Sequence, residues 1–234
     1  MIKMELLEIK SLTKSFDDKK ILKDVNLSIS NGKIIGLLGK NGAGKTTLIK
    51  IINDLLTINK GEVLIKGNKI GVESKKVISY LPERTYLNKQ MKVCEVINYF
   101  KDFYDDFDVD KAKKLLKDLD LDINQNLSKM SKGMQEKVQL VLVMSRNADL
   151  YILDEPLGGV DPATRDYILD TILSNFNENA SVIISTHLIS DIERILDEVI
   201  FIDKGKIILQ SDADKLRNKE KLSVDEIFRR MFKC

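Results

Sequence analysis

Short runs that alternate between apolar and polar residues fill the first thirty residues and the stretch of residues 61–81. Residues 25–29 and 62–65 are two of these runs, and turn residues such as Asn31 and Gly32 bound them. Alternation of this kind is typical of strands with one buried face, which are common in antiparallel sheets. We therefore predict antiparallel strands in both stretches.

The spacing of the apolar residues changes to a helical period between residues 91 and 121. Apolar residues recur there at intervals of three and four positions, namely Val93, Val96, Ile97, Phe100, Tyr104, Ala112, Leu115, Leu116 and Leu119. Such a period gives each helix one apolar face. A further helix is predicted from Ser131 to about Asn147, so the chain carries a helical insert over about residues 88–147.

Beyond this insert, the pattern predicts strands that alternate with helices. Three runs are apolar on both faces, as buried parallel strands are: residues 150–153, 182–185 and 199–202. Asp161 and Pro162 form a helix start signal, because aspartate favours the N-cap and proline the first helical position. A second helix is predicted from about Leu188, and this order indicates an α/β fold.

The tail begins at about residue 212, after a turn at residues 203–206. Its apolar residues have helical spacing, namely Val224, Ile227, Phe228 and Met231. This pattern predicts a helical tail, which would either pack on the core or extend a contact with a second copy of the chain.

Composition limits the classes of function. The 234 residues suffice for one large domain or for a domain with a subdomain. The 38 basic and 36 acidic side chains leave a net charge of +2, which is no signature of nucleic-acid binding. Cys94 and Cys234 are too few for a disulfide framework, and no window approaches the roughly 18 apolar residues of a membrane span. We expect a cytoplasmic chain, so another polypeptide would supply any membrane-spanning part.

Residues 39–46 read GKNGAGKT and lie between a strand-like run, residues 34–38, and a helical pattern at residues 48–52. A glycine-rich loop that ends at a helix N-terminus directs several backbone N–H groups at one anion. This context predicts a phosphate-binding loop, for which a lysine-capped surface turn is the alternative. The residues expected to hold a nucleotide here are Gly39, Asn41, Gly42, Gly44, Lys45, Thr46 and Thr47.

Each polar side chain of this loop has a separate expected role. Lys45 would neutralise the β- and γ-phosphates, and the hydroxyl of Thr46 would hold a magnesium ion. Thr47 would lie on the α-phosphate side.

Asp154 and Glu155 directly follow the apolar run at residues 150–153. Open parallel sheets present their ligands at this end of a strand, so Asp154 is a candidate second ligand for magnesium. Glu155, beside the metal, would accept a proton from the attacking water as a general base. An ordinary strand-end turn would explain these two residues if they stood alone, and the phosphate loop upstream favours the metal site.

Residues 130–135 read MSKGMQ and resemble the signature motif of the ATP-binding cassette (ABC) family. The chain resembles that family over about residues 1–210, with its motifs in the same order. Residues 39–46 resemble Walker A and residues 150–155 resemble Walker B. The remaining matches are Phe16 for the aromatic residue that stacks on adenine, residues 80–83 for the Q-loop region, residues 158–161 for the D-loop and His187 for the switch histidine.

The resemblance is to the ATP-binding subunit of an ABC transporter of the bacterial type. It implies a P-loop, RecA-like α/β core with an antiparallel β subdomain and an inserted helical subdomain. The ABC ATPase domain would occupy residues 1–210, and residues 211–234 would form the helical tail.

The resemblance also assigns roles to individual residues. Glu155, His187 and Glu83 would be catalytic, and Thr46, Asp154 and Glu83 would hold Mg²⁺. ATP held by Walker A of one copy would be covered by Ser131 and Gly133 of the other copy.

Four departures from the family pattern bear on the site. The signature usually reads LSGGQ, so Lys132 replaces its first glycine and Met134 its glutamine, while Ser131 and Gly133 are kept. Glu83 stands where glutamine is usual, and its contact with magnesium or water would be through a carboxylate. Gly158 replaces the common serine of the D-loop.

By resemblance, we expect an ATP-hydrolysing subunit that forms a homo- or heterodimer with a second nucleotide-binding subunit. It would power transport through an integral membrane permease at the inner face of the cell membrane, with no nucleic-acid partner. Export is the expected direction, because the SKGM form of the signature is often seen in bacterial export systems. The permease would dock at residues 83–92.

Two other classes are alternatives. A soluble, non-transport ABC ATPase would act on nucleic acid or the ribosome, and usually carries a second cassette, a coiled coil or a zinc insertion. A plain P-loop kinase or GTPase would lack the signature at Ser131.

Overall fold

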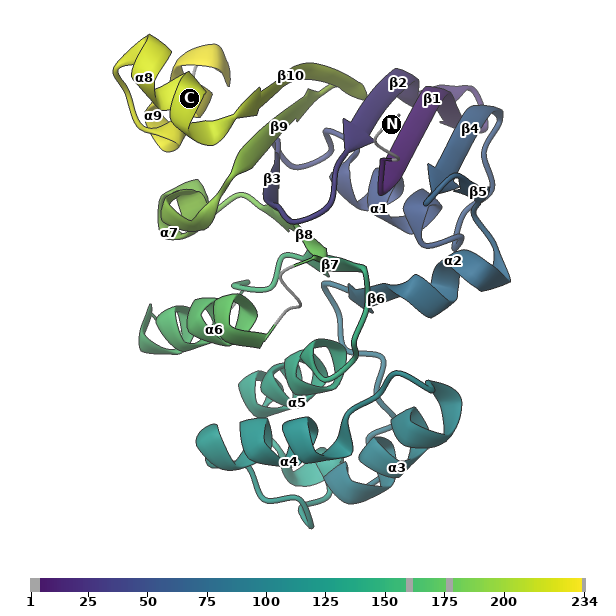
Figure 1. The fold of residues 1–234 in the computed structure, drawn as a ribbon, viewed down its shortest axis with the longest axis vertical. Coiled ribbons are helices and arrows are strands. Elements are labelled where there is room, and N and C mark those ends of the chain that lie inside the picture. The colour runs from purple at the N-terminus through teal and green to yellow at the C-terminus, as the bar shows by residue number, and fades with distance from the viewer. Residues whose placement is uncertain (1–4, 159–161, 176–178, 233–234) are drawn as a thin grey trace.

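The computed structural model of the chain describes residues 5–158, 162–175 and 179–232. Two sheets build one part of the molecule, and the helices of residues 93–144 build the opposite end (Figure 1). The C-terminal helices lie at the same end as the sheets.

A six-stranded sheet forms the centre of the fold. Its strands are Ile34–Leu38 (β3), Ile78–Leu81 (β6), Leu150–Asp154 (β7), Ser181–Thr186 (β8), Glu198–Asp203 (β9) and Lys206–Asp212 (β10). They follow the order β10-β9-β3-β8-β7-β6, and every neighbouring pair is parallel except the β9–β10 hairpin. β3, β7 and β8 are buried along their whole length, which explains their unbroken apolar sequences.

The second sheet is antiparallel. Its strands are Leu7–Phe16 (β1), Lys19–Ile29 (β2), Lys60–Ile65 (β4) and Asn68–Lys69 (β5), in the order β2-β1-β4-β5. The prediction of antiparallel strands over residues 61–81 is wrong for its last ten residues. Val72–Val77 forms helix α2, and β6 pairs in parallel with β7 at the edge of the central sheet. The four residues of β6 are too short a run to reveal which sheet they join.

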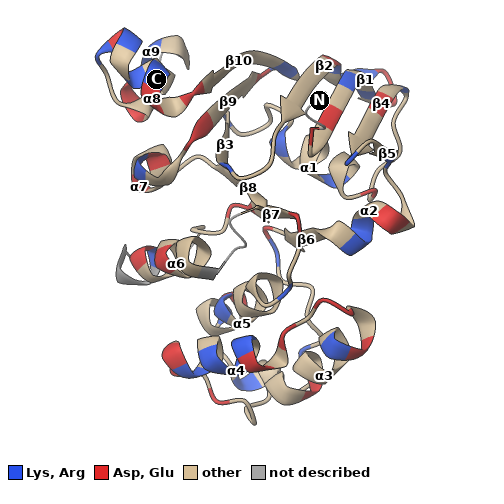
Figure 2. Ribbon diagram, in the orientation of Figure 1, with Lys and Arg blue, Asp and Glu red and all other residues tan. Residues whose placement is uncertain are grey.

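The predicted helical insert is confirmed. It consists of Val93–Phe103 (α3), Val109–Asp118 (α4), the 3-10 turn Leu127–Lys129 (η1) and Lys132–Met144 (α5). Its apolar stripes face inward: Val93, Val96 and Phe100 of α3 are buried, as are Leu115 and Leu116 of α4. Basic and acidic residues share the outer side of α4 (Figure 2). The α/β fold class with an antiparallel subdomain and a helical insert is therefore confirmed.

Three further helices cover the central sheet. They are Lys45–Ile52 (α1), Pro162–Asn175 (α6) and Ile189–Ile192 (α7), the last followed by a 3-10 turn, Glu193–Ile195 (η2). Pro162 begins α6 as predicted, whereas Asp161 lies outside the described residues. The helix expected from about Leu188 is a single turn that tightens into η2.

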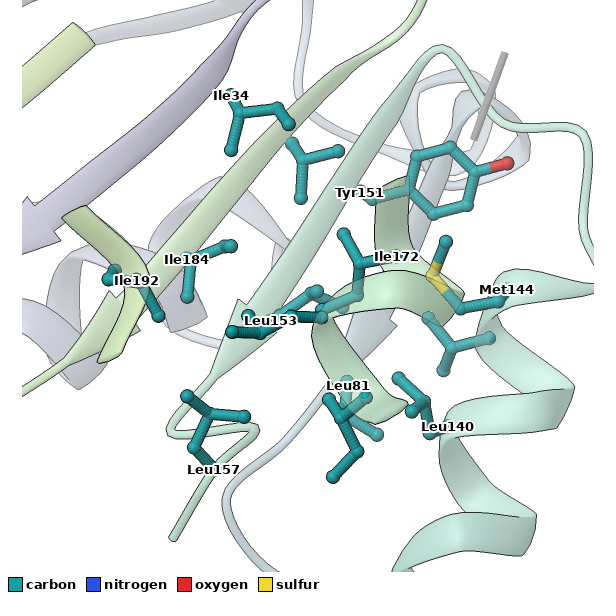
Figure 3. Packing of buried hydrophobic residues seen from close by; sticks show 14 of the residues in the cluster. Ile34, Leu81, Leu140, Met144, Tyr151, Leu153, Leu157, Ile172, Ile184 and Ile192 are labelled. Atoms are coloured by element: carbon teal, nitrogen blue, oxygen red, sulfur yellow. The ribbon is translucent and has the colours of Figure 1, made fainter. Parts of the chain in front are cut away.

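Apolar clusters on both faces of the central sheet form the core. Tyr151 and Leu153 of β7 join the cluster with the helical insert, whereas Leu150 and Ile152 join the cluster with α1 and the antiparallel sheet. Figure 3 shows the first cluster, where side chains from α5, α6 and α7 meet those of the strands. This packing on both faces holds the carboxyl ends of the parallel strands in fixed positions.

The C-terminal tail packs on this core, one of the two placements that its sequence left open. It forms Ala213–Glu220 (α8) and Val224–Phe232 (α9). Val224, Ile227 and Phe228 are buried in the core cluster, and Met231 is exposed. The ring of Phe228 lies 5.5 Å, centroid to centroid, from that of Phe201 on β9.

Arg146, which is only 4% exposed, ties the helical insert to the sheets. Its guanidinium donates two hydrogen bonds to the carboxylate of Asp106, at 2.9 and 3.1 Å. It also donates to the backbone carbonyls of Ile78 and Lys76, and it lies 3.9 Å from the ring centroid of Tyr104. One side chain therefore holds residues of the insert and of the α2–β6 segment together.

We expect Arg146→Met to lower the free energy of unfolding by about 3 kcal/mol, because it leaves the Asp106 carboxylate and two carbonyl groups without their donor. Chemical denaturation measures this loss. Arg194→Met is the control, since Arg194 is 61% exposed and pairs with an exposed Asp166. That pair should contribute less than about 1 kcal/mol. If the two variants lost similar amounts of unfolding free energy, Arg146 would contribute no more to stability than an exposed ion pair.

Candidate functional site

A cavity of about 920 Å³ lies where β3, β6, β7 and β8 present their carboxyl ends. Ten residues that the sequence singled out line it: Phe16, Asn41, Gly42, Gly44, Lys45, Thr46, Thr47, Glu83, Glu155 and His187. They come from segments far apart in the chain, and the topology of the central sheet brings them together.

The backbone of the loop after β3 requires its glycines. Gly42 and Gly44 have φ angles of 79° and 112°, in the left-handed region that side chains disfavour. A Cβ atom on Gly39 would lie 2.5 Å from the carbonyl oxygen of Ile202. Gly44 is also the N-cap of α1 and provides no side-chain cap. The first N–H groups of this helix are therefore available to an anion in the cavity.

Lys45 is the buried cation of this loop. Its ammonium group donates a 2.7 Å hydrogen bond to the Gly39 carbonyl and lies 4.0 Å from Oε1 of Glu155. Burial lowers the pKa of Lys45, and the carboxylates of Glu155 and Asp154 oppose that shift. An anion bound in the loop would favour the charged form further.

Asp154 ends β7 and is 1% exposed, beneath the cavity. Burial raises the pKa of Asp154, and the neighbouring hydroxyl groups of Ser185 and Thr46 oppose the shift. Within the described part of the chain, neither carboxylate oxygen makes a hydrogen bond of regular geometry. A buried carboxylate without a hydrogen bond of regular geometry is costly, so this position suits a bound cation.

Glu155 follows in a strained conformation, with φ of 52°, and its N–H donates to the Ser185 carbonyl at 2.8 Å. This geometry turns its carboxylate toward His187, whose Nδ1 lies 3.0 Å from Oε2 of Glu155. Glu83 lines the same cavity and also a small one of about 30 Å³ beside Asp154 and Glu155. Glu83, Glu155 and His187 thus line the larger cavity, and Asp154 lines the smaller one together with Glu83 and Glu155.

Phe16 ends β1 at the rim of the cavity and is 44% exposed. The ammonium group of Lys14, itself largely buried, lies 4.9 Å from the centroid of the Phe16 ring. An exposed aromatic ring beside a phosphate loop has a face on which a nucleotide base can stack.

Four of the predicted site residues do not line the cavity. Ser131 and Gly133 begin α5, and the Ser131 hydroxyl caps this helix by accepting from the Met134 N–H at 3.3 Å. A Cβ atom on Gly133 would meet no described atom within 4 Å, so this end of α5 is open. Gly39 and Asp154 are buried next to residues that line the cavity.

The cavity has further lining residues that the sequence analysis did not assign, namely Lys19, Ile21, Lys40, Arg84, Thr85, Lys132 and Glu136. Lys40 lies inside the phosphate loop, so its place on the cavity was readable from the sequence, whereas Lys132 lies in the motif expected to face the nucleotide of another copy. Lys19 and Ile21 belong to β2, and no sequence signal shows how its sheet meets the central one. Gly158 also lines the cavity, and the other predicted D-loop positions, residues 159–161, lie outside the described residues.

A second cavity, of about 760 Å³, lies between the α2–β6 segment and the helical insert. Exposed apolar side chains line it, namely Leu55, Val72, Tyr86 and Phe103. Tyr86 belongs to the segment of residues 83–92, where the sequence analysis expects a permease. No helix in the described ranges is both long and apolar enough to cross a membrane.

Known proteins resemble this chain over most of its length. The family profile described as "ABC transporter" matches residues 22–158. The uncharacterized ABC transporter ATP-binding protein MJ1023 of Methanocaldococcus jannaschii is 34% identical over 86% of this chain and 76% of its own length. The lantibiotic transport ATP-binding protein SrtF of Streptococcus pyogenes is 29% identical over 95% of this chain and 97% of its own length.

Solved structures give the same result. An ATP-binding subunit of an ABC transporter superposes with a TM-score of 0.88 at 27% identity, over 97% of this chain and 99% of that one. A bacterial Atm1-family ABC exporter with ATP bound gives a TM-score of 0.81 at 19% identity, over 96% of this chain and 42% of that one. At this lower identity, the second likeness concerns the fold alone.

Proposed function

Since the chain belongs to the ABC transporter family and is an ATP-binding subunit with ATPase activity, we propose that two copies enclose ATP between them and drive export through a separate membrane permease. The observation that carries this proposal is the division of the site. The phosphate loop, Glu155 and His187 line one cavity with Asp154 beneath it, whereas Ser131 and Gly133, at the open end of α5, do not line it although Lys132 between them does. Each copy would therefore hold half of each site.

The loop residues would bind the triphosphate. Backbone N–H groups of the loop, which contains Gly39, Asn41, Gly42 and Gly44, would surround the phosphates, while Lys45 would neutralise the β- and γ-phosphates. Thr47 would lie near the α-phosphate. The exposed ring of Phe16 would stack on the adenine. In a dimer, Ser131 and Gly133 of the second copy would cover the γ-phosphate.

We propose that Thr46, Asp154 and Glu83 hold Mg²⁺ with the nucleotide. The unpaired buried carboxylate of Asp154 fits such an ion. The described residues include no cluster of three His, Cys, Asp or Glu side chains suited to a metal. Magnesium needs none, because it is usually bound by one or two carboxylates together with substrate phosphates. When bound, it would neutralise charge that develops on the phosphates.

Hydrolysis would depend on Glu155 as the general base. Its carboxylate would accept a proton from the water that attacks the γ-phosphorus, as the bond from that phosphorus to the bridging oxygen breaks. His187, 3.0 Å away, would orient this carboxylate and contact the γ-phosphate. Glu83, on the same cavity, would contact the magnesium ion or the water.

The apolar cavity between α2 and the insert would receive a cytoplasmic helix of the permease. Exposed Phe103 and Tyr86 would be buried by that contact, which would hold the chain at the inner face of the membrane. Several similar proteins support export by their names, which include SkfA peptide export and lipopolysaccharide export ATP-binding proteins. We place the ATPase domain at residues 1–210 and the tail at residues 211–234.

Phe103→Asp tests this docking surface, because Phe103 is 67% exposed and its loss should leave the fold intact. We expect the tagged wild-type chain to co-purify from detergent-solubilised membranes with a polytopic protein encoded beside it. Phe103→Asp should reduce that recovery at least about tenfold, since a charge replaces buried apolar area.

Leu173→Asp, an exposed apolar position on α6 that does not line this cavity, is the control and should retain the partner. Purification of the wild type with ribosomes or DNA instead of a membrane protein would favour a non-transport ABC ATPase and contradict the proposal.

A further inference from the structure

The C-terminal helix α9 contacts the phosphate loop through Lys40. The ammonium group of Lys40 donates a 2.8 Å hydrogen bond to the backbone carbonyl of Phe232, a residue 192 positions away. The same group lies 5.9 Å from the centroid of the Phe232 ring. Lys40 also lines the 920 Å³ cavity, so one side chain connects the candidate nucleotide site with the tail.

The tail is fixed to the strand that borders the loop. The rings of Phe228 and Phe232 stack with a 4.2 Å centroid separation, and both lie against Phe201 of β9, at 5.5 and 6.2 Å. Phe201 is the register partner of Leu38, the last residue before the loop. The final turn of α9 therefore has a defined position relative to the loop.

The hairpin that supports the tail also supports the loop directly. The Ile202 carbonyl leaves no room for a side chain at Gly39, and the Gly205 N–H donates to the Ala43 carbonyl at 2.9 Å. These contacts hold the start and the middle of the loop from the side of the β9–β10 hairpin. The carbonyl end of a helix attracts a cation, so α9 is suited to hold the Lys40 ammonium group as a further support.

We propose that Lys40 is a positioning residue, through which α9 keeps the phosphate loop in the conformation that binds ATP. The inference rests on the proposed role of this loop in the function above. A loop that is already ordered loses less conformational freedom on binding. The Lys40–Phe232 contact should therefore raise the affinity for ATP.

Lys40→Met, a shortened chain and the combination of the two test the proposal. The ATP dissociation constant is measured by calorimetry in EDTA, which prevents hydrolysis. Lys40→Met keeps the aliphatic chain and removes the ammonium group. A chain that ends after Met231 lacks both the carbonyl and the ring of Phe232, and the matched control ends after Phe232. We expect the first two to weaken binding about fivefold to tenfold, which is less than the full value of one charge-assisted hydrogen bond because the contact acts on ATP only through the loop.

The combined variant should bind no more weakly than either single change, because both remove the same contact. The control that ends after Phe232 and Met231→Ala, an exposed position on the same helix, should stay within about twofold of the wild type. Unchanged or tighter ATP binding by Lys40→Met would overturn the inference. It would also be overturned if the loss of affinity in the combined variant equalled the product of the two single losses. Lys40 is exposed, so Lys40→Met gives an answer even where the shortened chain folds poorly. Failure of the wild type to bind ATP would instead contradict the proposed function.

Discussion

Replacing Glu155 with glutamine is expected to slow ATP turnover at least about 100-fold, while ATP binding stays within about twofold of the wild type. The substitution keeps the shape of the side chain in its left-handed backbone conformation and its reach to His187, and it removes only the proton acceptor. Phosphate release under steady-state conditions and calorimetric titration with ATP measure the two effects.

The same variant should accumulate as an ATP-bound dimer, because binding closes the pair and hydrolysis no longer opens it. Size-exclusion chromatography with light scattering, with and without ATP and Mg²⁺, gives the mass of the particle. Glu62→Gln, a half-buried carboxylate of the antiparallel sheet, controls for the loss of a negative charge. Full turnover by Glu155→Gln would exclude this carboxylate as the base.

Gly133→Asp is expected to slow hydrolysis strongly without weakening the fold. A side chain here meets open space in the single chain, and glycine within a helix is about 1 kcal/mol less stable than alanine. Aspartate in the first turn of α5 also interacts favourably with the helix dipole. The melting temperature should therefore stay the same or rise.

In a dimer, that carboxylate would face the γ-phosphate held by the other copy. The repulsion should lower turnover at least about 50-fold, a cost of roughly 2 to 3 kcal/mol, and should prevent the ATP-bound dimer. Gly71→Asp is the matched control, since it also fills open space at the start of a helix, at the N-cap of α2. If Gly133→Asp hydrolysed ATP at the wild-type rate, Gly133 would have no part in a shared site.

The phosphate loop and the buried strands next to the site could be predicted because short stretches of sequence determine them. The loop from Gly39 to Thr46 needs glycine at set positions and a helix directly after it, and both features are visible in the sequence. β7 and β8 were also predictable, since strands buried on both faces read as unbroken apolar runs.

The features that the sequence did not reveal depend on contacts between distant segments. β6 was assigned to the wrong sheet because its four residues would suit either one. Lys19 and Ile21 reach the cavity only because the two sheets meet there, and the tail reaches the loop only because Phe201 lies beneath it. The position of the helical insert likewise decides that Lys132 lines the cavity while Ser131 and Gly133 beside it do not.

Arg146 gives the apolar cavity a mechanical property. This side chain lines the cavity and also bonds to Asp106 on one side and to the Ile78 carbonyl on the other. Arg146 therefore connects the two walls of the cavity, and a movement of either wall would change the shape of the cavity. A tilt of the helical insert would therefore change the binding site of a helix in this cavity. Movement of that helix would likewise be transmitted to the insert.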